Sequence, residues 1–251
     1  MFRSRLSSTA TAVFCASGVA GVALLAAQQQ QQSRVAHTEQ KLPKLMYFNI
    51  TGLGFPIRAA LNAGKVAFVD ERLDFADVGK LRGPEGSNEQ VPLGQLPLFV
   101  FPNGHVACQS NSILRWAGKK SGLYPKDDDE AQLVDEVLDT TVDFFGKLPQ
   151  SKDAAELKKL REAFIQGDFA KQMKYYSRRL TLHPGKFLLG DKFTVADLKL
   201  AATMSYVAEG KLDHFNEAIL KEYPVVWAHY QAVVAHPVYA EQMKREAQVA
   251  K

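Results

Sequence analysis

The chain has 251 residues, of which 46% are hydrophobic and 23% are charged, and its formal net charge is +4. This length and hydrophobic content are enough for one large domain or two smaller ones, each with its own core. The low net charge, and aromatic residues that do not alternate with a basic stripe, argue against nucleic acid as the main partner. The two cysteines are Cys15 and Cys108. Because Cys15 falls in a leader, the folded part has one thiol and no internal disulfide, which fits a reducing compartment.

The first forty residues differ in composition from the rest. Arg3 and Arg5 lie in a start rich in serine and threonine, an uncharged apolar run covers residues 12–27, and the first acidic residue is Glu39. This pattern is typical of a mitochondrial targeting leader, and the "QQQQQ" tract after the apolar run reads as a low-complexity linker. A secretory signal, a membrane-anchoring segment with some membrane association, and a cytoplasmic location after processing stay open as alternatives. We therefore expect residues 1–40 to be a targeting leader outside the fold.

Residues 44–124 have the pattern of an α/β unit. Apolar runs rich in β-formers, such as "KLMYFNI", predict strands, and "FPIRAALNAGK" has its apolar residues at helical spacing. The turn signal Pro102-Asn103-Gly104 separates two apolar runs and predicts a hairpin. The predicted order is strand, helix, strand, loop, strand, strand and helix, over residues 44–50, 55–65, 66–75, 83–94, 96–101, 105–109 and 110–122.

From residue 129 onward the sequence indicates helices almost throughout. Apolar residues recur at spacings of three and four in four segments, at residues 133–148, 157–173, 193–208 and 224–237. Within the third segment, Thr194 and Asp197 have the spacing of an N-terminal capping box, with Phe193 placed as the hydrophobic staple. The composition therefore predicts an all-α half after the α/β half.

A polar break, "QSNS", interrupts the α/β half between a strand and a helix. One interpretation is that Ser110 is the N-cap of the following helix. The other is that Gln109, Ser110 and the unpaired N–H groups of the helix N-terminus bind an external carboxylate. Upstream, Pro97 begins a strand, where a cis bond would turn the Leu96 backbone outward toward an extended peptide, and a trans proline at an edge strand is the alternative.

The motifs "LMYFNITG", "GQLPLF", "QSNSILRW" and "FLLGDKFTVADLKLA", in this order, resemble a cytosolic-type glutathione S-transferase, with the sigma-like class as the most similar. The resemblance covers residues 44–244. It implies an α/β thioredoxin-like N-terminal domain over residues 44–124, an all-α helical C-terminal domain over residues 129–247, and a homodimer.

The same resemblance implies a set of site residues. Tyr47 matches the family's catalytic tyrosine, whose hydroxyl stabilises the glutathione thiolate, with the nearby Thr51 as an alternative hydroxyl. Two departures from the sigma-like pattern are Leu53, in place of an arginine that supports the thiolate, and Val78, in place of a tryptophan. The other residues implied to bind glutathione are Arg82, Gln95, Leu96, Pro97, Gln109, Ser110 and Asp143, the last reaching across the dimer interface.

The predicted function is that of a detoxifying glutathione transferase, which conjugates the thiolate to small hydrophobic electrophiles. Glutathione is the co-substrate, and we expect no prosthetic group and no metal, because the six histidines lack ligand spacing. Apolar residues of the helical half, such as Phe144 and Phe145, are expected to line the electrophile pocket. A glutathione-binding protein without activity, and a glutathione-dependent peroxidase or isomerase, are the alternatives.

Overall fold

The computed structural model describes residues 42–249. The predicted leader and its targeting signal, including any membrane association, lie outside these residues. Within them, no helix is both long and apolar enough to cross a bilayer.

The α/β half is built on a four-stranded sheet in the order β2-β1-β3-β4. β1 runs parallel to β2, and β3 runs antiparallel to both β1 and β4. The strands are β1 (Lys44–Phe48), β2 (Val69–Leu73), β3 (Leu98–Val100) and β4 (Val106–Ala107). In β1, Leu45 and Tyr47 are buried between half-buried neighbours, as expected for a strand that packs on a helix.

Three helices accompany the sheet: α2 (Gly54–Ala63), α3 (Phe75–Arg82) and α4 (Ser110–Ser121). The strands, the helix α2, the hairpin and the helix α4 confirm the predicted order. The prediction was wrong over residues 75–82, where it had no helix. α3 is eight residues long, contains Gly79 and buries only Val78, so it lacks the apolar stripe from which a helix is predicted.

The helical half contains α5 (Asp128–Lys147), α6 (Ala154–Phe164), α7 (Ala170–Leu180), α8 (Val195–Ala208), α9 (Glu217–Lys221), α10 (Pro224–Ala235) and α11 (Pro237–Val249). The predicted helix over residues 157–173 is instead two α-helices joined by a π-helical turn, Ile165–Phe169. The sequence pattern also missed α9 and α11.

α8 is the central helix of this half and is buried on nearly every side. The predicted capping box at its start is confirmed: the Asp197 carboxylate accepts from the Thr194 N–H at 2.8 Å, and Thr194 Oγ1 lies 2.8 Å from the same oxygen. Asp197 also accepts from the Leu188 N–H and contacts Nε2 of His229 at 2.9 Å. Because Asp197 is fully buried, these contacts fix the loop before α8.

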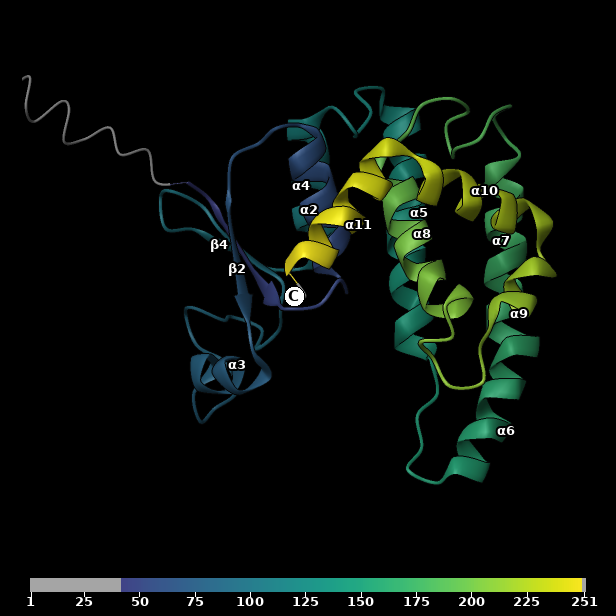
Figure 1. Cartoon of the computed structure of the whole chain (residues 1–251), viewed down its shortest axis with the longest axis horizontal. Coiled ribbons are helices and arrows are strands. Elements are labelled where there is room, and N and C mark those ends of the chain that lie inside the picture. Colours follow the sequence, from purple (N-terminus) through teal and green to yellow (C-terminus); the bar gives the residue numbers. More distant parts are fainter. Residues whose placement is uncertain (1–41, 250–251) are drawn as a thin grey trace, which may run out of the picture. The chain divides into compact units, whose positions relative to one another are not determined.

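The two halves pack through helices. α2 contacts α4, α8 and α11, so the last helix of the chain lies against the α/β half (Figure 1). Side chains from both halves belong to one hydrophobic core, while Tyr47, Val78, Val91, Leu96 and Leu98 form a second, smaller cluster. The architecture is a thioredoxin-like α/β domain followed by an all-α domain, as predicted; the exact domain boundaries stay predictions.

Candidate functional site

Tyr47 lies near the end of β1 with its side chain buried. Its hydroxyl oxygen accepts a hydrogen bond from the Leu53 N–H at 2.9 Å. Burial raises the pKa of the Tyr47 phenol, nearby Tyr206 adds to the rise, and the Leu53 hydrogen bond and the Arg58 charge oppose it. The phenol is therefore protonated at neutral pH, and its O–H remains available as a donor, because the Leu53 contact uses an oxygen lone pair.

Two glycines let the chain wrap closely around this ring. A Cβ on Gly52 would lie 2.4 Å from the Tyr47 hydroxyl oxygen, and one on Gly54 would lie 2.6 Å from a ring carbon. Gly52 also has a φ of +41°, in the left-handed region. The segment "TGLG" thus needs glycine at both positions to bring the Leu53 N–H onto the hydroxyl.

The register of the sheet brings the other motifs beside Tyr47. Met46 is paired with Leu98, and Phe99 with Ala107. Continued past these pairs, the two antiparallel registers place Pro97 between Tyr47 on one side and Gln109 on the other. Three motifs that are far apart in the sequence therefore meet in one row at one end of the sheet.

The Leu96–Pro97 peptide bond is cis, the first of the two geometries considered from the sequence. Leu96 and Pro97 are buried, whereas the Gln95 side chain is exposed. Among the described residues, the Leu96 N–H and C=O make no hydrogen bond with another backbone group. The Leu96 backbone is thus unpaired beside the row that contains Tyr47.

The polar break begins the helix α4. The interpretation of Ser110 as an N-cap is wrong, because the helix starts at Ser110 itself and the capping position is Gln109. Gln109 has a φ of 73° and its side chain makes no capping bond. No hydrogen bond of the Ser110 hydroxyl to another described residue is found. Within the described residues, the Ser110 hydroxyl and the first N–H groups of α4 are therefore donors without an internal acceptor.

The structure does not bring Arg82 and Asp143 into this row. Arg82 is the last residue of α3, and its Nε is buried without a hydrogen-bond partner among the described groups. Asp143 lies on the exposed face of α5 and is 3.6 Å from the ammonium of Lys147. Thr51 is half-buried, and its carbonyl accepts from the Phe55 N–H at 2.8 Å, so its backbone helps to start α2.

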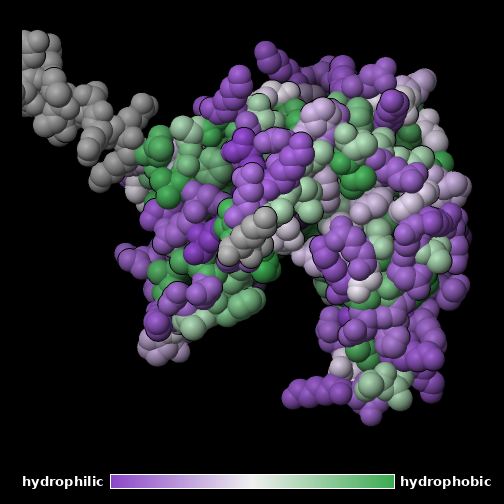
Figure 2. All heavy atoms as spheres, in the orientation of Figure 1, coloured by the Kyte–Doolittle hydropathy of each residue, from purple (hydrophilic) through white to green (hydrophobic). Residues whose placement is uncertain are grey.

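A narrow pocket lies next to the Tyr47 loop, between the two halves. It is lined by Thr51, Gly52 and Phe55 from the α/β half, and by residues of α8 and α11 that include Ser205, Tyr206 and Tyr239. Figure 2 shows a hollow between the two halves of the molecule, with apolar surface on the α/β side. Tyr206 was not selected from the sequence. The one feature that could have indicated it is its polar hydroxyl near the end of an otherwise apolar predicted helix.

Phe144 and Phe145 were predicted to line the electrophile pocket, and the prediction is wrong for Phe144. Phe144 is fully buried in the core among Phe164, Phe169 and Phe215, so it does not line the pocket. Phe145 is half-buried and packs edge-on against the Tyr206 ring at 5.4 Å between centroids. It therefore supports a wall of the pocket.

Two other features lie apart from the row. A hollow of about 920 Å³ is lined by residues from segments 119–131 and 189–194, and none of the residues of the row lines it. Residues 42–249 contain no group of three histidine, cysteine or acidic side chains that could hold a metal ion. The chemistry available at the row is that of a hydroxyl, a backbone edge and a helix N-terminus.

Comparisons with known proteins find similarity to one family. A family model described as "Glutathione S-transferase, C-terminal domain" matches residues 138–244. A glutathione S-transferase class-mu 28 kDa isozyme of Schistosoma japonicum is 28% identical over 198 residues, which cover 76% of this chain and 91% of that protein. Glutathione S-transferase P 1 of Xenopus laevis is 29% identical over 208 residues, covering 81% of this chain and 92% of that protein.

These matches support the glutathione S-transferase family for this chain. They also support an enzyme, a glutathione transferase. Among solved structures, prostaglandin synthase D of Nilaparvata lugens matches with a TM-score of 0.68 and 26% identity, covering 81% of this chain and 98% of that one. Monomeric Na-GST-3 of Necator americanus, a glutathione S-transferase, matches with a TM-score of 0.69 and 27% identity, covering 81% and 97%.

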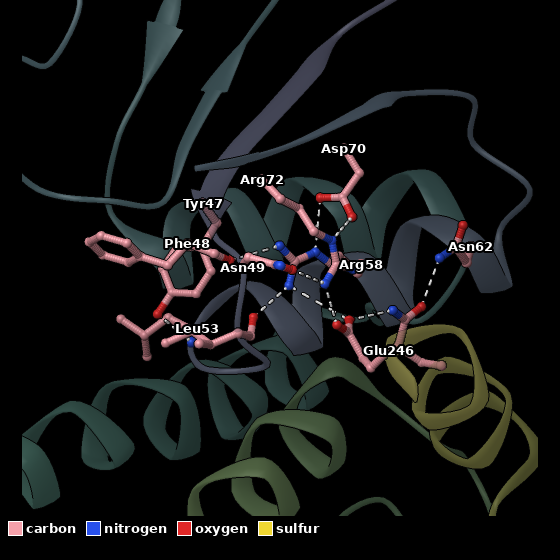
Figure 3. A network of polar contacts seen from close by, with 11 residues as sticks. Tyr47, Phe48, Asn49, Leu53, Arg58, Asn62, Asp70, Arg72 and Glu246 are labelled. Carbon is pink, nitrogen blue, oxygen red and sulfur yellow. Dashed lines mark hydrogen bonds and ion pairs between the residues drawn. The ribbon is translucent and has the colours of Figure 1, made fainter. Parts of the chain in front are cut away.

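The similar proteins belong to more than one class of the family. The curated relatives carry mu and P class names. The sigma-like class therefore stays a prediction. Sequence reasoning also missed a network of charged side chains, in which Arg58 lies beside the Tyr47 ring and is linked to Asp70, Arg72 and Glu246 (Figure 3).

Proposed function

We propose that this glutathione transferase uses the Tyr47 hydroxyl to stabilise the thiolate of glutathione, and adds that thiolate to small hydrophobic electrophiles. The observation that carries the proposal is the buried, protonated phenol in a row with Pro97 and Gln109, with its O–H available as a donor. A thiol with a pKa near 8.5 is only a few per cent ionised at pH 7. A hydrogen bond to the sulfur anion lowers that pKa, and each unit corresponds to about 1.4 kcal/mol.

Glutathione is proposed to lie along the row. Its cysteinyl backbone would pair with the unpaired N–H and C=O of Leu96, as an added strand does. Its γ-glutamyl carboxylate would accept hydrogen bonds from Ser110, Gln109 and the N–H groups that begin α4. Two further residues are proposed to contact glutathione. Arg82 would pair with the glycyl carboxylate of glutathione, and Gln95 would contact its peptide backbone.

In the proposed reaction, the thiolate sulfur forms a bond to an electrophilic carbon while a leaving group departs with its electron pair, or while a conjugated double bond accepts the pair. The thiol proton leaves to solvent. The electrophile is proposed to approach the sulfur from the side of the narrow pocket lined by Phe55, Tyr206 and Tyr239, which itself has free volume for no more than about one water molecule.

The decisive experiment replaces Tyr47 by phenylalanine, which removes the hydroxyl and keeps the ring. Glutathione affinity is expected to stay within a few-fold, and turnover of a chloronitroaromatic substrate to fall at least tenfold. The pKa of the bound thiol, measured by thiolate absorbance in the ultraviolet, is expected to rise. An unchanged thiol pKa would exclude Tyr47 as the stabilising group, and Thr51→Ala then becomes the next variant.

A second function is favoured by one observation. Leu53 offers Tyr47 only its backbone N–H, so no charged side chain at this position supports the thiolate. The chain could then be a glutathione-binding protein without transferase activity. Retention on glutathione resin without turnover would select this reading, and turnover of a hydroperoxide or of an isomerisable substrate would select a peroxidase or isomerase.

A homodimer is proposed because Asp143 is exposed on α5 and does not reach the row of its own chain. From a partner, it would pair with the γ-glutamyl ammonium. Since one similar structure is titled monomeric, sedimentation of the purified protein is the direct test. If the protein sediments as a dimer and Asp143→Asn does not weaken glutathione binding, the proposed role of Asp143 is wrong.

We also propose that residues 1–40 direct the chain to mitochondria. Fusion of these residues to a fluorescent reporter should move the reporter into that organelle. A diffuse reporter would refute targeting, and a secreted one would refute the organelle.

A further inference from the structure

Arg58 is a fully buried arginine in α2, in the middle of the apolar run "FPIRAAL". Its Nε donates to Asp70 at 2.9 Å, and its Nη1 lies 3.6 Å from Glu246. A buried guanidinium is costly unless it is paired and hydrogen-bonded. A charged side chain at this position is not explained by packing of the apolar core, so its role depends on its polar contacts.

The two acids are shared with a second arginine, which closes a ring of four charges. Arg72 donates to Asp70 at 2.8 Å and to Glu246 at 2.6 Å. The ring joins α2, β2 and α11, and it is electrically neutral (Figure 3). A neutral ring held from three elements fixes the position of the Arg58 guanidinium closely.

The Arg58 guanidinium also donates to the loop that follows Tyr47. Its Nη1 donates to the Ile50 carbonyl at 2.9 Å, and its Nη2 contacts the Phe48 carbonyl at 3.4 Å. Both carbonyls belong to the short stretch between Tyr47 and Leu53, whose ends are joined by the hydrogen bond to the Tyr47 hydroxyl. The guanidinium carbon also lies 5.7 Å from the centre of the Tyr47 ring.

We propose that Arg58 is a positioning residue for Tyr47, and that Asp70 and Glu246 hold it in place. The guanidinium fixes the loop that brings the Leu53 N–H to the hydroxyl, and its charge beside the ring favours a strongly donating phenol. The last helix of the chain thereby contributes to thiolate formation through Glu246. This inference rests on the proposed role of Tyr47.

The test uses Arg58→Lys, which keeps the charge but replaces the planar fork, whose three nitrogens reach separate acceptors, by a single ammonium. We expect kcat to fall about tenfold and the pKa of the bound glutathione thiol to rise by about one unit, with KM for glutathione within about threefold. In a Tyr47→Phe background, Arg58→Lys should lower kcat by less than about twofold, since residues that act as one unit are not additive.

Glu246→Gln removes one charge of the ring at nearly constant shape and is expected to raise the thiol pKa by less than Arg58→Lys does. It also keeps the inference testable if Arg58→Lys does not fold. The matched control is Arg115→Lys, the same substitution at an arginine of α4 that pairs with Asp135 and Asp139 of α5. This control should lower the melting temperature without moving the thiol pKa.

Two results separate this inference from the function on which it rests. If Tyr47→Phe leaves the thiol pKa unchanged, the proposed function fails, and this inference fails with it. If Tyr47→Phe raises the thiol pKa but Arg58→Lys and Glu246→Gln do not, or if the losses in kcat add in the double variant, only the role of Arg58 is wrong and the ring is a structural tie.

Discussion

Leu53→Pro would remove the N–H that donates to the Tyr47 hydroxyl and would put the proline Cδ in the place of the amide hydrogen, so the hydroxyl must also move away from its present position. Leu53 has a φ of −71°, close to the value that the proline ring fixes, and as the N-cap of α2 it donates no hydrogen bond within the helix. A hydrogen bond of this kind contributes about 0.5–1.5 kcal/mol. Its loss should raise the pKa of the Tyr47 phenol further and, together with the displacement of the hydroxyl by the proline ring, lower kcat at least about fivefold.

The comparison variant is Leu53→Ala, which also loses the leucine side chain but keeps the N–H. Circular dichroism should show that both variants are folded, and thiolate absorbance should show a raised thiol pKa in Leu53→Pro alone. If both variants shift the thiol pKa equally, the side chain matters and the N–H does not. If neither shifts it, the hydrogen bond to Tyr47 has no part in thiolate formation.

Four further expectations follow from single contacts. Gly52→Ala places a Cβ 2.4 Å from the Tyr47 hydroxyl oxygen and should lower kcat about a hundredfold, whereas Gly146→Ala, which meets no atom within 4 Å, should not change it in the same assay. Ser110→Ala should weaken glutathione binding roughly tenfold or more by calorimetry, because a hydrogen bond to a charged group contributes about 1.5–3 kcal/mol, while the melting temperature barely moves. Asp197→Ala leaves the Thr194 and Leu188 N–H groups buried and unpaired, and should cost about 3 kcal/mol or more in urea unfolding. Burial lowers the pKa of Lys199 to about 8, below its unfolded value, so the unfolded chain binds more protons above pH 8, and the free energy of unfolding should rise between pH 8 and 10 in the native protein but not in Lys199→Met.

The parts of the fold that the sequence predicted are those with local signals. The strand at "KLMYF", the hairpin at Pro102-Asn103-Gly104 and the capping box at Thr194 each depend on residues a few positions apart. α3 was missed because its eight residues have no apolar periodicity. The N-cap of α4 was predicted at Ser110 but lies one residue earlier, at Gln109. Gln109 has a positive φ of 73°, which the sequence does not indicate for a glutamine.

The candidate site divides in the same way. Tyr47, Pro97, Gln109 and Ser110 could be selected because each belongs to a motif, and the sheet register then placed three of them in one row. Nothing local indicates that Arg58 in α2 meets Glu246 in the last helix. Such a pair forms only when the two halves pack, so it is visible in tertiary structure alone.

The contacts of the Tyr47 hydroxyl explain why the leucine at position 53 is compatible with a transferase. The hydroxyl is held by a backbone N–H, the ring is enclosed by two glycines, and the loop between them is fixed through its carbonyls by Arg58. None of these contacts requires a particular side chain at position 53, because each uses the main chain. If Tyr47 stabilises the thiolate as proposed, activity is expected to depend on the conformation of residues 48–54 more than on the side chain at position 53. An inactive protein would be expected only if this loop could not hold the N–H on the phenol, and the four charges behind it are arranged to hold that loop in place.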